Sequence, residues 1–482
     1  MTTPTSSESR ADALGREDLV GFISAALACT GQAEFYGDAA GQAVSIDFYH
    51  QYMLGNYRRM YAHCLAAGVN DFNRATIIVN LLLTAAQVPG PARAEEGRLI
   101  AAALRELPPN RVYRLFERLV DLRLNNRRIR RIVCDYLDGR REPELHAIKY
   151  RRRLAKIVAH FHLRRGPEES ALLFRLAGVR RFTTPLFESF RRARYDERAI
   201  YELPYTVAEG LAARKGIPRE RFLARIAPRL TTRERLRLQS LGREREIEAI
   251  AEQDLSRHSL TRLAIYFLSL SPAQRRLQFS AFDQAMRAAA ARLVRRAGLR
   301  LQKVAVVLDN SYSASGSPAK RDRPLALALA CRFVLEQATD QLSVRWTSPP
   351  GSLCDLKAVG HTDLATPVLE MLAEAPSLLV LVSDGYDNDP PGGAAEIVRV
   401  FRERLDPNHA ITLVHFNPVY DAGEYALQGI HPAMVTLGIR DAEGLPTLLG
   451  FARFVDGSAG LTELQALLEA RAHELIGEEP RA

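Results

Sequence analysis

Apolar residues recur every three or four positions along the first 300 residues, in stretches separated by Pro and Gly. This spacing predicts helix after helix, with almost no strand-like alternation. Ser45 and Asp71 stand where helix caps are expected, and Ser271-Pro272 opens another helix. The clearest predicted helices are Ile46–Ala67, Asn70–Ala86, 94–106, 109–124, 126–138 and 142–163. Helices joined by short turns predict an α-solenoid of HEAT-like character, or an irregular bundle.

The pattern changes after Gly298, where short apolar, β-branched runs alternate with amphipathic stretches. The predicted strands are Val304–Leu308, Leu342–Trp346, Leu378–Val382, Ile411–Phe416 and Val435–Ile439. Strands that alternate with helices predict a mostly parallel, doubly wound (Rossmann-like) sheet covered on both faces. Leu353–Val359 is a candidate antiparallel edge strand.

Three regions follow from these patterns: a disordered lead-in (1–17), an all-helical domain (18–300) and an α/β domain (301–482). The lead-in lacks the apolar core of a signal peptide, and no apolar run approaches the roughly 18 residues of a membrane span. Five scattered cysteines without a CxxC pair fit a reducing compartment. We therefore expect a cytoplasmic protein without a membrane partner.

Charge is divided unevenly along the chain. Residues 101–300 contain 45 basic and 22 acidic side chains, whereas residues 301–482 contain 14 basic and 24 acidic side chains. Nearly all of the basic excess is Arg. A basic half and an acidic half favour two different partners.

Hard oxygen ligands follow the first predicted strand, where Asp309, Ser311 and Ser313 occupy alternate positions. Thr362 lies just before a predicted helix, and Asp384 follows the strand that ends at Val382. Binding residues of open α/β sheets cluster beyond the carboxyl ends of the strands. One or two carboxylates with three hydroxyls suit Mg²⁺, which prefers oxygen ligands and retains water elsewhere.

These three loops resemble, in residue type and order, a von Willebrand factor A (vWA) domain with a metal-ion-dependent adhesion site. The family's Asp-x-Ser-x-Ser motif matches residues 309–313, its Thr matches Thr362 and its distal Asp matches Asp384. The resemblance extends from residue 303 to about residue 478, and Asn310 and Tyr312 depart from the usual x residues. It implies Mg²⁺, or another divalent cation such as Mn²⁺ or Ca²⁺, with a position open to an acidic partner. The alternative is a vWA fold whose loop serines only cap turns.

Arginines crowd the basic half, with aromatic residues between the clusters. Arg pairs bidentately with phosphate and stacks on bases, which suits single-stranded or irregular RNA. The alternative is a set of solvated helix faces whose arginines pair with nearby Glu and Asp. The candidate RNA-binding residues are Arg127, Arg128, Arg130, Arg131, Arg151, Arg152 and Arg153.

Helical repeats followed by a vWA domain resemble the Ro autoantigen (TROVE) family, whose helical ring binds small non-coding and misfolded RNAs. This resemblance rests on domain order and charge alone. A second interpretation is a protein adaptor like the vWA proteins that work with MoxR-type AAA+ ATPases, and a third is a scaffold with a structural metal. We expect no enzyme, because the P-loop, the dinucleotide-binding glycines and the His-Glu-x-x-His motif are absent.

Overall fold

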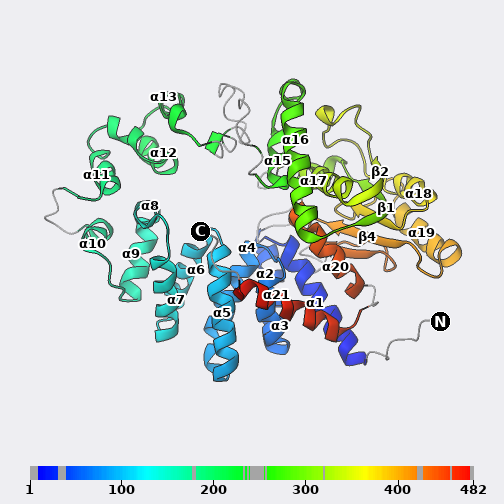
Figure 1. The fold of residues 1–482 in the computed structure, drawn as a ribbon, viewed down its shortest axis with the longest axis horizontal. Coiled ribbons are helices and arrows are strands. Elements are labelled where there is room, and N and C mark those ends of the chain that lie inside the picture. The colour runs from blue at the N-terminus through cyan, green and yellow to red at the C-terminus, as the bar shows by residue number, and fades with distance from the viewer. Residues whose placement is uncertain are drawn as a thin grey trace. The chain divides into compact units, whose positions relative to one another are not determined.

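The computed structural model divides the chain into two compact units, each of which combines separate segments (Figure 1). The sheet unit combines Met1–Asn73 with Leu236–Glu474, and the helical unit combines Arg74–Arg235 with Leu475–Ala482. The structure describes residues 9–30, 39–175, 181–231, 234–235, 238, 255, 258–317, 321–420, 427–455 and 459–477. Over those residues, none of the helices combines the length and the apolar character needed to cross a lipid bilayer.

Five parallel strands form the centre of the sheet unit, in the order β2-β1-β3-β4-β5. They are β1 (Leu301–Leu308), β2 (Thr339–Trp346), β3 (Leu378–Val382), β4 (Thr412–Asn417) and β5 (Val435–Gly438). In register, Leu308 pairs with Trp346 on one side and with Val382 on the other. The five strands predicted from the apolar runs are confirmed, and so is the mixed helical and α/β character of the chain.

Helices cover both faces of this sheet, which explains why its central strand β3 and the second half of β1 are apolar and buried. On one face, α18 (Ala365–Ala373) and α19 (Gly393–Val400) bury Val368 and Val398 against Val307 and Leu381. On the other, α17 (Arg323–Ala338) packs against β1 and β2, and α20 (Leu445–Val455) packs against β5. The sequence analysis did not identify α20.

The predicted edge strand at Leu353–Val359 is wrong, because this segment begins with the short 3₁₀ turn Leu353–Asp355. The buried Arg275, from α16 (Pro272–Ala297), donates to the carbonyl oxygens of Cys354 and Leu356. Those carbonyls accept hydrogen bonds from a guanidinium group, so they do not pair with a neighbouring strand. The same arginine donates to the carbonyls of Phe267, Leu268 and Leu270, so it joins this loop to the end of α15 (Leu260–Ser269).

The first helices of the chain pack with the sheet. Helix α1 (Arg10–Ala28) lies against β5, where a side chain at Gly438 would approach the carbonyl oxygen of Ser24 to 2.1 Å. Helix α1 begins at Arg10 because Ser9 caps it, accepting a 3.1 Å hydrogen bond from the Asp12 backbone. The predicted disordered lead-in is therefore corrected at residues 10–17, and its residues 1–8 lie outside the described part of the chain.

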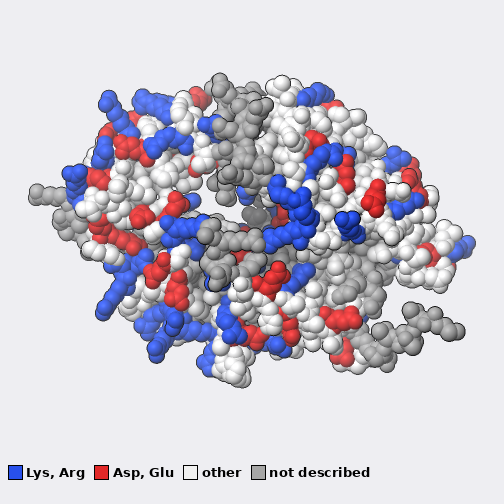
Figure 2. All heavy atoms as spheres, viewed as in Figure 1, with Lys and Arg blue, Asp and Glu red and all other residues white. Residues whose placement is uncertain are grey.

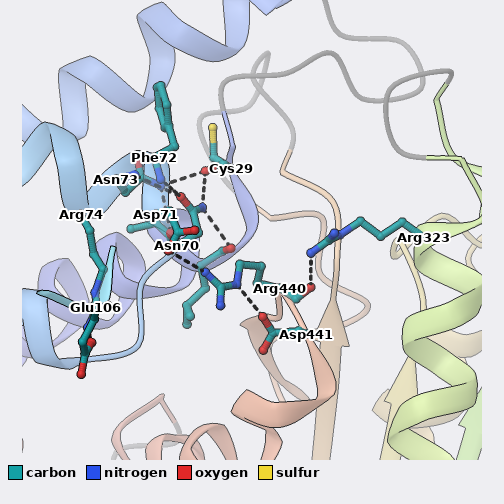
Figure 3. A network of polar contacts seen from close by, with 12 residues as sticks. Cys29, Asn70, Asp71, Phe72, Asn73, Arg74, Glu106, Arg323, Arg440 and Asp441 are labelled. Carbon is teal, nitrogen blue, oxygen red and sulfur yellow. Dashed lines mark hydrogen bonds and ion pairs between the residues drawn. The ribbon is translucent and has the colours of Figure 1, made fainter. Parts of the chain in front are cut away.

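A polar network joins the end of α1, the start of α4 (Asp71–Leu83) and the loop after β5 (Figure 3). The Asn70 side chain caps α4 and donates to the Cys29 carbonyl at 2.6 Å. Asp71 pairs with Arg440 at 3.6 Å, and Arg323 donates to the Arg440 carbonyl at 2.9 Å. Asp71, which the sequence suggested as the cap, instead forms this ion pair.

Two predicted long helices are each divided at a tyrosine. The stretch Ile46–Ala67 belongs to α2 (Ala39–Asn56) and α3 (Arg58–His63), and Tyr57 between them has φ −134°. The stretch 142–163 contains α8 (Pro143–Lys149) and α9 (Arg151–His160). Tyr150 between these two stacks on Tyr113, with ring centroids 4.4 Å apart.

The helical unit contains the arginine-rich helices. Besides α8 and α9 it includes α5 (Gly90–Glu106), α6 (Pro109–Asp121), α7 (Arg127–Asp138), α10 (Pro167–Phe174), α11 (Pro185–Arg192), α12 (Tyr205–Arg214) and α13 (Arg219–Ile226). Helix α8 packs against α9, α10, α11 and α12, and α6 packs against α9. The helix boundaries of this unit lie near the predicted Pro and Gly positions. A Pro occupies the first turn of α6, α8, α10 and α11, where its missing N–H costs no hydrogen bond within the helix.

Candidate metal site and arginine clusters

Two carboxylates lie at the carboxyl ends of the neighbouring strands β1 and β3. Asp309 follows Leu308 directly, and its backbone N–H donates to the Val382 carbonyl at 3.0 Å, which extends the ladder by one residue. Asp384 comes two residues after Val382. Both side chains are buried, each 4% exposed. Parallel pairing of two adjacent strands therefore brings together residues that are 75 positions apart in the sequence.

Burial raises the pKa of both carboxyls, and the neighbouring Asp384 raises the pKa of Asp309 further. Hydrogen bonds oppose this effect: the Ser311 backbone donates to Asp309 at 2.7 Å, and Ser313 and the Tyr386 backbone donate to Asp384. Within the described residues, neither carboxylate forms an ion pair with Lys or Arg. The described part of the chain therefore provides no positive counterion for this pair.

Two hydroxyls stand beside the carboxylates. Ser311 and Ser313 lie at the start of the short 3₁₀ turn Tyr312–Ser315, and their Oγ atoms are 3.1 Å apart. Ser311 is 1% exposed, so it reaches little solvent. The alternate spacing seen in the sequence thus places both hydroxyls and Asp309 together, as predicted for this loop. Together with Asp384 they form a compact set of four oxygen-bearing side chains.

Thr362 lies on a loop that is bonded to the other two. The Gly360 carbonyl accepts from the Tyr312 backbone at 3.0 Å, and the Thr362 carbonyl accepts from the Asn388 and Asp389 backbones at 3.0 Å each. The Thr362 side chain is buried, at 3% exposed. The structure therefore brings all three predicted loops to one end of the sheet, with Thr362 placed by backbone contacts.

A cavity of about 10 Å³ adjoins the two carboxylates. This is close to the space that one water-sized sphere occupies. Its lining residues are Asp309, Ala314, Pro324, Val382, Ser383, Asp384 and Pro418. The enclosed space beside the carboxylates therefore suits a single ion or water.

Other acidic residues near the site have structural roles. Asp387 accepts from the backbones of Leu364 and Ala394, at 3.1 and 2.7 Å, and so secures the starts of α18 and α19. Across the described residues, no three His, Cys, Asp or Glu side chains come together as a metal-binding group. Any cation here would depend on the hydroxyls beside the two carboxylates, because the carboxylates alone provide too few ligands.

Asn310, one of the two departures from the vWA pattern, connects three loops. Its amide donates to the Ser348 carbonyl at 2.8 Å, and its oxygen accepts from the Ser348 backbone at 2.8 Å and from the Thr347 hydroxyl at 3.0 Å. Thr347 also donates to Asp309 at 3.3 Å. The sequence analysis did not name Thr347, although it follows β2 directly and the rule that sites lie beyond strand ends could have identified it.

The loop that carries Asp384 rests on buried polar residues that the sequence analysis missed. His415, fully buried on β4, contacts the Ser383 carbonyl at 3.1 Å and Thr436 at 3.2 Å, and burial lowers its pKa to about 4. Asn417, at the end of β4, donates to the Asp384 carbonyl at 2.9 Å. Their positions on β4, the strand that pairs with β3, determine where the Asp384 backbone lies.

The predicted RNA-binding arginines differ in their surroundings. Arg127 and Arg130 are exposed on α7, whereas Arg131 pairs with Asp135 at 3.5 Å and Arg128 donates to the Arg93 carbonyl at 2.8 Å. On α9, Arg153 pairs with Glu117 at 2.8 Å. Figure 2 shows Lys and Arg interspersed with Asp and Glu over the helical unit. The charge excess is thus partly neutralised by ion pairs within the unit, as the alternative interpretation anticipated.

Comparisons with models of known protein families and with curated proteins find no match to this chain. Function is therefore inferred from the residues and the geometry described above.

Proposed function

We propose that this chain is a divalent-cation-dependent binding protein whose sheet unit contains a vWA-like metal site. One observation carries the proposal: two buried carboxylates and two hydroxyls lie together at the ends of β1 and β3 without a positive counterion in the described structure. Like charges buried together are costly unless a cation or protons neutralise them. The strand order and the three loop positions support a vWA-like fold.

The donor set fits Mg²⁺, with Mn²⁺ or Ca²⁺ as the other candidates. Asp309, Ser311, Ser313, Thr362 and Asp384 would bind it; of these, the two carboxylates also line the small cavity described above. A bound cation would supply an electrophilic position for a carboxylate or phosphate of a partner. The chain's own residues orient the donors: Thr347 and Asn310 secure Asp309, and Asn417 secures the Asp384 loop.

Calorimetric titration with MgCl₂ tests this site. We expect the wild-type chain to bind one equivalent, and we expect Ser311→Ala and Asp309→Ala to abolish the binding. Ser315→Ala is the matched control, because Ser315 lies in the same turn and contributes its carbonyl, not its hydroxyl, to the Asp322 backbone. Equal Mg²⁺ binding by Ser311→Ala and the control would contradict the proposal.

The second half of the proposal assigns RNA binding to the helical unit, by the arrangement that resembles Ro/TROVE proteins. The exposed Arg127 and Arg130, together with the first turn of α9, support it. RNA affinity should fall steeply with salt, because each phosphate contact displaces a counterion. Fluorescence anisotropy with a single-stranded RNA at several KCl concentrations measures that slope, and the absence of binding at low salt would favour the protein-adaptor interpretation.

A further inference from the structure

Arg151 begins α9, and it stands among four other arginines. Burial and the charges of Arg194, Arg175, Arg152 and Arg214 lower its pKa. These residues come from different elements: Arg175 ends α10, Arg194 follows α11, and Arg214 lies in the last turn of α12. Helix α8 packs against α9, α10, α11 and α12, so the elements that carry these arginines share one neighbour, and their charges lie close enough to act on Arg151. We call this set the arginine cluster.

The cluster lacks an internal counterion. Among the described residues, none of its five arginines forms an ion pair with Asp or Glu, and the buried Nη1 of Arg151 has no hydrogen-bond partner. Other arginines of the helical unit are matched: Arg153 pairs with Glu117 at 2.8 Å, Arg165 with Asp138 at 2.7 Å and Arg191 with Glu188 at 2.6 Å. The acidic partners that neutralise those arginines are missing from the described surroundings of the cluster, so its positive charge is available to an anion.

The helix beneath the cluster adds to the positive potential. Arg151, Arg152 and Arg153 occupy the first turn of α9, and Tyr150 provides no side-chain cap. The N–H groups of a first helical turn have no acceptors within the helix, and they form the positive end of its dipole. Basic side chains at this end destabilise a helix, whereas an anion stabilises it. Three basic residues thus occupy a helix start, where acidic residues are preferred, and the unpaired guanidinium nitrogen of Arg151 lies in the same turn.

We infer that the arginine cluster binds a phosphate group of RNA, an inference that rests on the RNA-binding half of the proposed function. Arg matches phosphate oxygens bidentately, and five guanidinium groups with free helix N–H groups can surround one phosphate. Tyr195, next to Arg194 in the chain, is 80% exposed and offers a ring on which a base can stack. The exposed ring favours a nucleotide over an isolated phosphate ion.

Binding of a fluorescent single-stranded RNA to the full chain tests the inference. Arg151→Gln with Arg152→Gln should weaken binding by about tenfold per lost contact and reduce the salt slope by about one per phosphate released. The matched control is Arg165→Gln paired with Arg191→Gln, which removes the same charge from arginines that already have acidic partners. We expect the control to change affinity less than about threefold.

The outcomes separate the inference from the proposed function. Suppose that wild type binds RNA and that both double variants lose the same affinity. The arginine cluster then contributes only to the overall positive potential of the helical unit, and the inference is overturned while RNA binding stands. If wild type binds no RNA at low salt, both fail. In a second arm, inorganic phosphate is added at constant ionic strength; thermal stabilisation of wild type without RNA binding would assign the cluster to free phosphate and also overturn the inference.

Discussion

The two units each gather like charges, but they do so in opposite environments. In the sheet unit, Asp309 and Asp384 are 4% exposed and receive hydrogen bonds from neighbouring serines and backbone groups. In the helical unit, the arginine cluster is more exposed, and only the Nη1 of Arg151 is both buried and unpartnered. Burial makes charge expensive, so on the proposed function we expect the sheet unit to depend more strongly on an external counterion than the helical unit.

Arg275 provides the internal reference for this comparison, because it is a buried arginine whose hydrogen bonds are satisfied. It donates to five backbone carbonyls, whereas the Nη1 of Arg151 donates to none. Replacing Arg275 with Met should leave those carbonyls unpaired and lower the free energy of unfolding by about 4 kcal/mol. Chemical denaturation measures this, and a loss below about 1 kcal/mol would show that the network is dispensable.

Acid should act on the sheet unit through His415. Its pKa is about 4 in the folded protein and ordinary when unfolded, so the unfolded chain binds more protons between these values. The contribution of His415 to stability therefore falls as pH drops from about 6.5 to about 4, by on the order of 3 kcal/mol, whereas the raised pKa values of Asp309 and Asp384 act in the opposite direction. His415→Gln, which can keep a hydrogen bond to Ser383, should flatten that part of the pH profile. Hydrogen exchange of β4 at several pH values provides the measurement; parallel profiles for both proteins would contradict the assignment.

Asp309→Asn should stabilise the cation-free protein at neutral pH, by on the order of 2 kcal/mol, because it removes one of two buried like charges. The gain should shrink in acid, where the raised pKa already keeps the wild-type carboxyl protonated. The same variant should lose stabilisation by Mg²⁺. Thermal melting with EDTA and with MgCl₂ tests both effects, and a destabilised cation-free variant would contradict the idea of an unmet negative charge.

Arg151→Gln should change stability least, with a gain of about 0.5 kcal/mol at low salt that disappears at high salt. The reason is relief of repulsion from the surrounding arginines. Thermal melting at two KCl concentrations measures this change. If the variant instead loses more than about 1 kcal/mol, Arg151 is a packing residue and the contrast between the two units weakens.

Sequence patterns predicted the strands well, because most of them contain a compact apolar run that is buried on both faces, as in β1 and β3. They also brought Asp309, Ser311, Ser313 and Asp384 together, since adjacent parallel strands end at one edge of a sheet. The failed edge strand at Leu353–Val359 shows the limit: Arg275, 79 and 81 residues away in sequence from its acceptors, takes the carbonyls that a ladder would need. Such long-range competition leaves no local signal.

The supporting residues of the site were harder to find for the same reason. His415 and Asn417 matter only because β4 lies beside β3, and a strand order cannot be read from apolar runs alone. Likewise, the change from helices to strands between Ala297 and Leu301 is visible in the sequence, but the packing of α1 against β5 is not. Both the strand order and the packing of α1 depend on contacts between segments that are far apart in the sequence.

The close approach of α1 to Gly438 has a practical consequence for anyone who dissects this chain. Strand β5 is an outer strand of the sheet, and α1 shields it. A fragment that starts at residue 301 would keep every candidate metal ligand but lose this shield, leaving a bare strand open to self-association. Fragments that retain residues 9–73 alongside the α/β segment are the ones expected to remain monodisperse.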